Sequence, residues 1–541
     1  MLRLTEIKLP LHHSDAQLRA AVLQRLQIGD DELVEFTVFR RGVDARRKSA
    51  IAFIYTLDVR TRCDEDLLEH FAHDPHVVSS PDTSYRFVTD AHESATAQRV
   101  ANQPRPLVIG SGPCGILAAL VLAQMGFRPI VLERGKAVRE RTKDTWAFWR
   151  KSQLNPESNV QFGEGGAGTF SDGKLYSQVK DPGHHGRKVL SEFVKAGAPA
   201  EILTASKPHI GTFRLVKMVE HMRASIEELG GEFRFGCCVT DVEIDGGQIR
   251  GVRLADGEEI RSDHVVLAIG HSARDTFAML HARGVLVEAK PFSIGFRIEH
   301  PQSLIDAARY GACAGDPLLG AADYKLVHHA SNGRSVYSFC MCPGGTVVAA
   351  ASEPGRVVTN GMSQYSRDER NANSAIVVGI TPQDYPGDVL AGIDFQRRWE
   401  QHAFVLGGSD YSAPGQRVGD FLAGRASTAF TSVQPSYTPR VHPCDLATAL
   451  PDYAIAALRE AIPAFDRQIK GFSLADAVLT AVETRTSSPI RITRNDADRQ
   501  SLNTRGLFPA GEGAGYAGGI LSAAIDGIKT AEAVAISMIG K

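Results

Sequence analysis

Hydrophobic and polar positions along the chain follow two periods, and the fully apolar stretches are short. Runs at 107–109, 129–132, 264–269 and 507–509 are apolar at almost every position, which is typical of strands buried on both faces of a parallel sheet. Helices are expected after the first and last runs, over Ile116 to Leu122 and from about Ile520 to Met538. The pattern predicts an α/β fold.

The first 98 residues have a different pattern and are expected to form a separate small α+β domain. Apolar alternation predicts strands at 2–9, 33–39 and 51–59. Between the first two, Ser14 and Gln17 have the spacing of a capping box and open a predicted helix.

A basic loop is expected between the second and third of these strands. Its five cations are Arg40, Arg41, Arg46, Arg47 and Lys48. These cations are candidates to bind phosphates or a partner, and the alternative is a solvated hairpin loop with no binding role. A polar, proline-flanked stretch at 96–105 is the expected linker to the rest of the chain.

A glycine-rich sequence directly follows the apolar run 107–109. Its residues are Gly110, Ser111, Gly112, Pro113, Cys114 and Gly115. In a strand–turn–helix unit the first glycine permits the turn, the second lets a pyrophosphate approach the backbone, and the third lets the helix pack closely on the strand. The helix N-terminus then attracts the pyrophosphate, and Cys114 is expected to contact it through its backbone.

An acidic residue supports the same interpretation. Glu133 ends the next apolar run, about 20 positions on, where a carboxylate can hydrogen-bond a ribose hydroxyl. The sequence therefore predicts a site for an ADP moiety.

The far end of the chain indicates which dinucleotide is expected. The run 507–509 leads into Gly511 and Glu512, and a glycine-rich stretch then ends at Gly519, before the helix from Ile520. This arrangement is similar to that of flavoproteins, which implies that Glu512 meets the ribityl or pyrophosphate part of FAD and that the helix N-terminus stabilises negative charge on the reduced flavin. NAD-only Rossmann proteins lack this C-terminal return, so FAD is favoured.

These elements, with the strand that ends at Gly270, resemble the FAD-binding fold of the glutathione-reductase-like superfamily. The resemblance covers about 100–170, 207–290 and 480–541. It implies further cofactor contacts at Arg134, Gly165, Gly166, Ser171, Val239, Gly270, Gly519 and Ile520.

A narrower resemblance spans nearly the whole chain. Segments 40–48, 159–175, 339–345 and 360–363 are similar to those of a bacterial family of uncharacterised FAD-dependent dehydrogenases. The resemblance implies the fold and the cofactor, with 159–175 as a flavin-facing loop, and brings no settled substrate.

The expected fold class is therefore α/β, with three domains. A Rossmann-like FAD-binding domain comes in two parts, 99–290 and 481–541, around an inserted α+β substrate-side domain at 291–480. The small α+β domain at 1–98 precedes them.

Three residues are candidates for the chemistry. Lys174 is placed to hydrogen-bond flavin N5 or to stabilise the reduced ring, unless it only caps its loop. Arg485 offers a bidentate grip on a substrate carboxylate, and the alternative is a salt bridge to Glu483 or another acid. A disulfide between Cys340 and Cys342 would be strained, and both are expected on one face of a strand. A single functional thiol at Cys342, next to Pro343, Gly344 and Gly345, is the better candidate.

Composition narrows the classes of function. The 541 residues carry a net charge of −2, which gives no general attraction to nucleic acid or anionic membranes. Charged residues interrupt the apolar segment 518–539, so no membrane span is expected.

The start lacks a signal-peptide pattern, and eight irregularly spaced cysteines suit reduced thiols, so a cytoplasmic location is expected. Paired histidines lack further ligands at metal spacing, and no metal is expected.

The leading interpretation is an FAD-dependent oxidoreductase of dehydrogenase or reductase type, acting on a small molecule under the inserted domain. A flavin monooxygenase using NAD(P)H and O2, an RNA-modifying flavoprotein and a non-enzymatic flavin protein are the alternatives. The region 290–480 carries no second dinucleotide fingerprint, so electrons come from the substrate, from transiently bound NAD(P)H or from a protein donor. A partner protein or a second copy is expected to bind, if at all, through the N-terminal domain.

Overall fold

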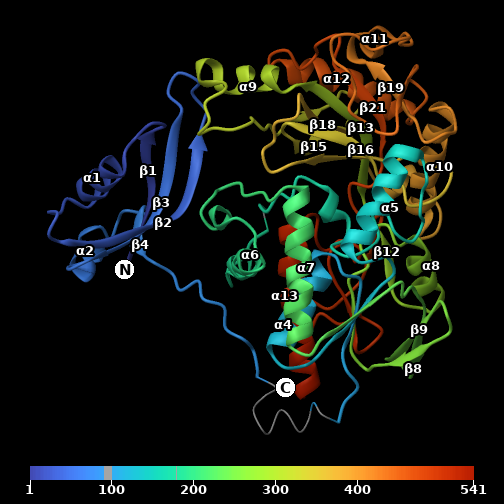
Figure 1. The fold of residues 1–541 in the computed structure, drawn as a ribbon, viewed down its shortest axis with the longest axis horizontal. Coiled ribbons are helices and arrows are strands. Elements are labelled where there is room, and N and C mark those ends of the chain that lie inside the picture. The colour runs from blue at the N-terminus through green and yellow to red at the C-terminus, as the bar shows by residue number, and fades with distance from the viewer. Residues whose placement is uncertain (91–99, 101, 178, 541) are drawn as a thin grey trace.

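The structure is a computed structural model that describes residues 1–90, 100, 102–177 and 179–540. Figure 1 shows a small N-terminal unit beside a larger body, in which a Rossmann-like domain lies below a second α+β domain, the cap.

The N-terminal unit is a four-stranded antiparallel sheet with two helices. The strand order is β2-β3-β1-β4. Its elements are β1 (Leu2–Pro10), α1 (Asp15–Leu26), β2 (Leu33–Asp44), β3 (Ala52–Thr61), α2 (Asp64–His70) and β4 (Val77–Ser79). The predicted capping box at Ser14 and Gln17 is confirmed, and α2 and β4 are additions that the sequence pattern did not predict.

The basic segment is a strand for half of its length, which corrects the prediction of a loop from residue 40. The ladder between β2 and β3 continues through Arg41, opposite Tyr55, to Asp44. The Arg41 amide donates to the Thr204 carbonyl (2.6 Å) and its carbonyl accepts from the Ser206 amide (2.9 Å). The unit is therefore docked on the Rossmann-like domain. Half of the predicted linker, at 96–99 and 101, lies outside the described residues.

The Rossmann-like domain is built on a five-stranded parallel sheet in the order β23-β11-β5-β6-β7. The strands are β5 (Leu107–Ile109), β6 (Ile130–Glu133), β7 (Glu232–Phe235), β11 (Val265–Leu267) and β23 (Leu507–Pro509). Its helices are α4 (Pro113–Gln124), α5 (Val138–Lys151), α6 (His185–Lys195), α7 (Thr212–Glu228), α8 (Arg274–Ala282) and α13 (Ile520–Ile539).

Both faces of this sheet are covered, which explains the uninterrupted apolar runs. Val108, Val131 and Val266 pack with α4, α7 and α13, while the strand residues on either side of them face a small antiparallel sheet. That sheet consists of β8 (Val239–Asp245), β9 (Gln248–Leu254) and β10 (Glu259–Arg261).

The cap is organised around a seven-stranded sheet in the order β14-β15-β18-β13-β21-β19-β20. Its strands are β13 (Phe292–Pro301), β14 (Val327–His329), β15 (Ser335–Cys342), β18 (Asn371–Ile380), β19 (Ala413–Arg417), β20 (Val441–Pro443) and β21 (Val478–Glu483). A separate two-stranded ribbon joins β16 (Gly345–Ala349) to β17 (Thr359–Ser363). The helices are α9 (Gln302–Tyr310), α10 (Ala391–Leu406), α11 (Val418–Ala423) and α12 (Asp452–Asp466).

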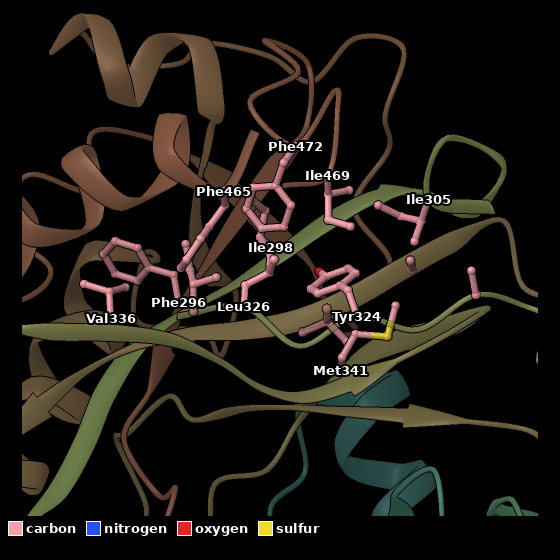
Figure 2. Close-up of a cluster of buried hydrophobic side chains, with 14 of the residues drawn as sticks. Phe296, Ile298, Ile305, Tyr324, Leu326, Val336, Met341, Phe465, Ile469 and Phe472 are labelled. Atoms are coloured by element: carbon pink, nitrogen blue, oxygen red, sulfur yellow. The ribbon is translucent and has the colours of Figure 1, made fainter. Parts of the chain in front are cut away.

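The cap has its own core, in which α12 and the loop after it cover the sheet (Figure 2). Phe296 and Ile298 of β13 meet Val336 of β15 and Phe465 of α12 in one buried cluster. Below it, β12 (Val287–Ala289) pairs with β22 (Ile490–Ile492), so the two chain crossings into the cap are adjacent. This junction holds the cap over the Rossmann-like domain.

Candidate cofactor and substrate site

A cleft lies at the carboxyl ends of the parallel strands and is lined by both the Rossmann-like domain and the cap. Ligands of open α/β sheets bind at this edge. Of the residues expected at the cofactor, the lining contains Gly110, Ser111, Gly112, Pro113, Cys114, Glu133, Arg134, Gly166, Ser171, Val239, Gly270, Gly511, Glu512, Gly519 and Ile520. It also contains Lys174, Cys342 and Arg485.

In the glycine-rich turn, one glycine is needed for packing and another borders the binding cleft. A Cβ on Gly115 would lie 1.9 Å from the Gly110 carbonyl oxygen, so Gly115 packs α4 against β5 and stays outside the cleft lining. A Cβ on Gly112 would have only the Gly166 Cα within 4 Å, at 3.7 Å. Gly112 therefore borders open space at the start of α4.

Glu133 is buried at the end of β6 and joins three loops. Its carboxylate accepts from the Ser111 amide (2.9 Å) and hydroxyl (2.7 Å), and from the amides of Gly135 and Gly163 (both 2.9 Å). A carboxylate has about four lone-pair sites. In this structure it is thus engaged with the loops, not open to a ribose, and it fixes the turn against the segment 159–175.

A buried arginine shapes the same segment. The Arg141 guanidinium donates to the carbonyls of Asn159 (2.8 Å), Val160 (2.8 Å), Gly163 (3.2 Å) and Glu164 (2.7 Å). Burial lowers the pKa of Arg141 to about 10, so it is still cationic at neutral pH. Nothing in the sequence pattern distinguishes Arg141 from an exposed helix residue.

Gly165 lies behind the cleft, which corrects its expected contact with the cofactor. Its amide donates to the Ser111 carbonyl (2.9 Å), and a Cβ would lie 2.1 Å from the Thr169 hydroxyl. With a φ of 86°, Gly165 shapes the loop from the side away from the cleft.

The C-terminal return is fixed by an ion cluster below it. Asp526 of α13 accepts from Arg494 (2.7 Å) and from the Gly511 amide (2.7 Å), and it also pairs with Arg499. Glu512 lines the cleft, and none of the described residues donates a hydrogen bond to its carboxyl group. Burial raises the pKa of Glu512 to about 7, against the opposing charge of Lys290.

Arg485 is committed to the protein, which corrects its expected role as a substrate anchor. Its Nε and Nη2 donate to the two oxygens of Glu400 (both 3.1 Å), and its Nη1 donates to Ser272 (3.0 Å) and Ser352 (2.6 Å). Arg274 binds the same Glu400 carboxylate through two nitrogens. The alternative of a salt bridge to an acid is correct, with Glu400 as the acid.

The two cap thiols do not share one regular strand face. β15 has a register shift between Phe339 and Cys342, and Cys340 has a φ of 44°. Cys340 is exposed in the cleft, whereas Cys342 is buried with its thiol 3.3 Å from the Cys340 carbonyl. Desolvation raises the pKa of Cys340 to about 12 and raises that of Cys342, so both are thiols at neutral pH. Cys340, and not the favoured Cys342, is the accessible thiol.

Lys174 lies where the flavin-facing loop meets the cap. Burial favours its neutral form, but the Cys342 thiol, once it ionises at high pH, and Asp172 outweigh that effect and raise the pKa of Lys174. The Asp172 carboxylate is itself held by two nitrogens of Arg367, at 3.0 and 2.5 Å. Asp172 and Arg367 were not expected site residues, although Asp172 lies within the segment 159–175.

The comparisons with known proteins agree with this geometry. Family models described as "FAD-dependent protein, C-terminal domain-like", "FAD dependent oxidoreductase" and "Domain of unknown function (DUF8436)" match residues 291–486, 174–312 and 1–60. An uncharacterized protein of Clostridium beijerinckii is 46% identical over 533 residues, which is 98% of each chain. The chain belongs to a family of FAD-dependent oxidoreductases.

Solved structures similar to this FAD-dependent oxidoreductase are distant. The flavin-dependent brominase Bmp2 is 14% identical, with 81% of this chain and 80% of that chain covered and a TM-score of 0.37. L-proline dehydrogenase from P. horikoshii is 12% identical, with 81% and 94% covered and a TM-score of 0.34.

The cleft of this FAD-dependent oxidoreductase fits its cofactor. Gly270, Gly518 and Gly519 border it with nothing within 4 Å of a built Cβ, so the wall is open where an extended ligand passes. Helices α4 and α13 both begin at the cleft without a side-chain cap, which leaves their N-termini to an anion. The carboxyl of Glu512 supplies an acceptor for hydroxyl groups. The cofactor is FAD.

The cap contributes lining residues that the sequence did not single out. They include Phe339, Cys340, Asn360, Gly361, Glu483 and Thr486. Asn360 and Gly361 lie in the segment 360–363, whose family resemblance was the only sign of their role in the sequence.

None of the described helices is both long and apolar enough to span a membrane.

Proposed function

We propose that this FAD-dependent oxidoreductase is of dehydrogenase or reductase type and exchanges hydride between flavin N5 and a small molecule held under the cap. One observation carries the proposal. Cap residues such as Phe339 and Asn360 line the same cleft as the glycine-rich turn and the C-terminal return. A binding space for a second molecule is thus continuous with the space for the cofactor.

The chain's own groups bind, orient and shield. FAD, when bound, supplies the hydride chemistry. The N-terminus of α4 binds the pyrophosphate, and the N-terminus of α13 stabilises negative charge at the other end of the cleft. The cap excludes water, which strengthens every electrostatic contact inside.

Anaerobic mixing tests the proposal. The purified yellow protein is mixed without oxygen with NADH, with NADPH and with a panel of organic metabolites, while the visible flavin absorbance is followed. We expect at least one of these compounds to bleach the flavin absorbance, and we expect an oxidised acceptor to restore it.

Two outcomes would contradict the proposal. One is a flavin that chemical reductants bleach but no metabolite or nicotinamide does. The other, in a parallel assay with air present, is NADPH oxidation that requires an organic substrate and consumes an equal amount of O2 while the substrate gains an oxygen atom, which is the signature of a monooxygenase.

A further inference from the structure

We propose that the small molecule under the cap is a carboxylate, and that Lys174 binds its negative charge. This inference rests on the proposed function, because it names the substrate class of the same site. It assigns Lys174 to the substrate, not to flavin N5.

Lys174 has hydrogen-bonding capacity to spare. Its Nζ lies 3.8 Å from the nearer Asp172 oxygen, which is an ion pair but too long for a hydrogen bond. Asp172 is already matched by the bidentate contact with Arg367. The Lys174 ammonium donates no hydrogen bond to any of the described residues, although an ammonium has three donors.

The other cations at the cleft are already paired. Arg485 shares Glu400 with Arg274. Arg134 makes bidentate contacts with both Glu157 and Asp275.

Behind the cap wall, Arg297 is matched in the same way by both oxygens of Glu483. Within the described part of the chain, Lys174 is therefore the cleft-lining Lys or Arg whose donors remain open.

The surroundings favour one negative charge. The acids that interact with Lys174 on the loop and on the cap, Asp172 and Asp323, are each paired with another cation, Arg367 and Lys207, so Lys174 leaves a local excess of one positive charge. Its side chain is only 20% exposed, and a partly buried cation is stabilised by an anion that fills its donors. A carboxylate matches this single open charge, whereas a phosphate dianion needs further open donors.

The first experiment uses the holoprotein and matched pairs of small ligands. Acetate, benzoate, acetamide and benzamide are titrated while the flavin absorbance spectrum is recorded. We expect a carboxylate to perturb the spectrum and its amide to bind about 10- to 100-fold more weakly, as for loss of a charge-assisted hydrogen bond. Lys174→Met should weaken carboxylate binding by the same factor, Lys174→Arg should retain part of it, and Lys217→Met, on the exposed face of α7, should behave as wild type.

The second experiment does not depend on the flavin spectrum. Cys340 is exposed in the cleft beside Lys174, so alkylation of its peptide is followed by mass spectrometry with iodoacetate and with iodoacetamide. The ratio of the two rates cancels the thiolate fraction. We expect the ratio of iodoacetate to iodoacetamide to fall about tenfold in Lys174→Met, because only iodoacetate carries the charge.

Three results would overturn the inference. The first is a wild-type protein that shows no preference for carboxylates in either experiment. The second is a Lys174→Met variant that prefers carboxylates as strongly as the wild type does. The third is a Lys174→Met variant whose flavin midpoint potential is shifted while its carboxylate affinity is unchanged. The last would assign Lys174 to the flavin. Failure of the proposed function is distinguishable, because carboxylates would then bind while no donor reduces the flavin.

Discussion

Replacing two glycines of one turn by larger residues should have two different effects, one on FAD binding and one on the fold. Gly112 has a φ of −73°, which any residue adopts, and a Cβ there meets ordinary contacts only. Gly115 packs on the carbonyl of Gly110, and a Cβ there falls about 1.5 Å short of an ordinary contact. Gly112→Val should therefore leave the fold intact and abolish FAD binding, whereas Gly115→Ala should damage the fold itself.

The magnitudes follow from these distances. For Gly112→Val we expect a loss of about 1 kcal/mol or less in the free energy of unfolding of the apoprotein, as for a poorer N-cap residue. FAD affinity should fall at least about 100-fold, or ~2.7 kcal/mol, because the branched side chain fills the approach to the pyrophosphate. For Gly115→Ala, overpacking of α4 against β5 should destabilise the apoprotein by about 1–3 kcal/mol.

The assay compares deflavinated proteins, since bound FAD would itself add about 2.7 kcal/mol at a hundredfold excess over Kd. Denaturant unfolding gives the stability of each apoprotein, and quenching of FAD fluorescence gives its affinity. Gly112→Ala serves as the graded control. A Gly112→Val protein that binds FAD normally, or one that is less stable than Gly115→Ala, would refute the reasoning.

Three further predictions concern the cleft walls. The folded-state pKa of Glu512, about 7, lies above the unfolded value of 4.5, so its contribution to stability is complete below pH 4.5 and lost as pH rises through 7. In denaturant unfolding of the apoproteins, the free energy of unfolding of Glu512→Gln should therefore rise relative to wild type by up to ~3 kcal/mol between those two pH values. A difference that stays constant with pH would contradict this. Glu400→Gln should cost about 3–5 kcal/mol in the free energy of unfolding, because it leaves Arg274 and Arg485 buried without a counter-charge, and a neutral effect in thermal unfolding would show that the cluster adds nothing. Cys340→Ser should keep both FAD content and the rate of flavin reduction, since a thiol with a pKa of about 12 is not a thiolate donor, and loss of reduction with FAD still bound would establish thiol chemistry.

The sequence alone determined the local units of the Rossmann-like domain. Apolar runs such as 107–109 and 265–267 are strands because both faces of their sheet are covered, and burial on two faces leaves no polar position. The capping box at Ser14 was equally readable, since its hydrogen bonds span three residues. The site for an ADP moiety followed from glycine spacing, because backbone approach to a pyrophosphate is set within a single turn, and FAD followed from the resemblance of the C-terminal return to that of flavoproteins.

Only the tertiary structure decided which side chains remain available for chemistry. In the sequence Arg485 was the expected substrate anchor and Lys174 the expected flavin contact, yet Glu400, 85 residues away, occupies Arg485, while no described residue pairs comparably with Lys174. Likewise, the strand shift in β15 exposes Cys340 in place of Cys342. Ion pairs and strand register join residues that are far apart in the chain, and periodicity reports only on neighbours within a turn or a strand. The sequence could therefore locate the cofactor, whereas the charge left open for a substrate depended on long-range pairing.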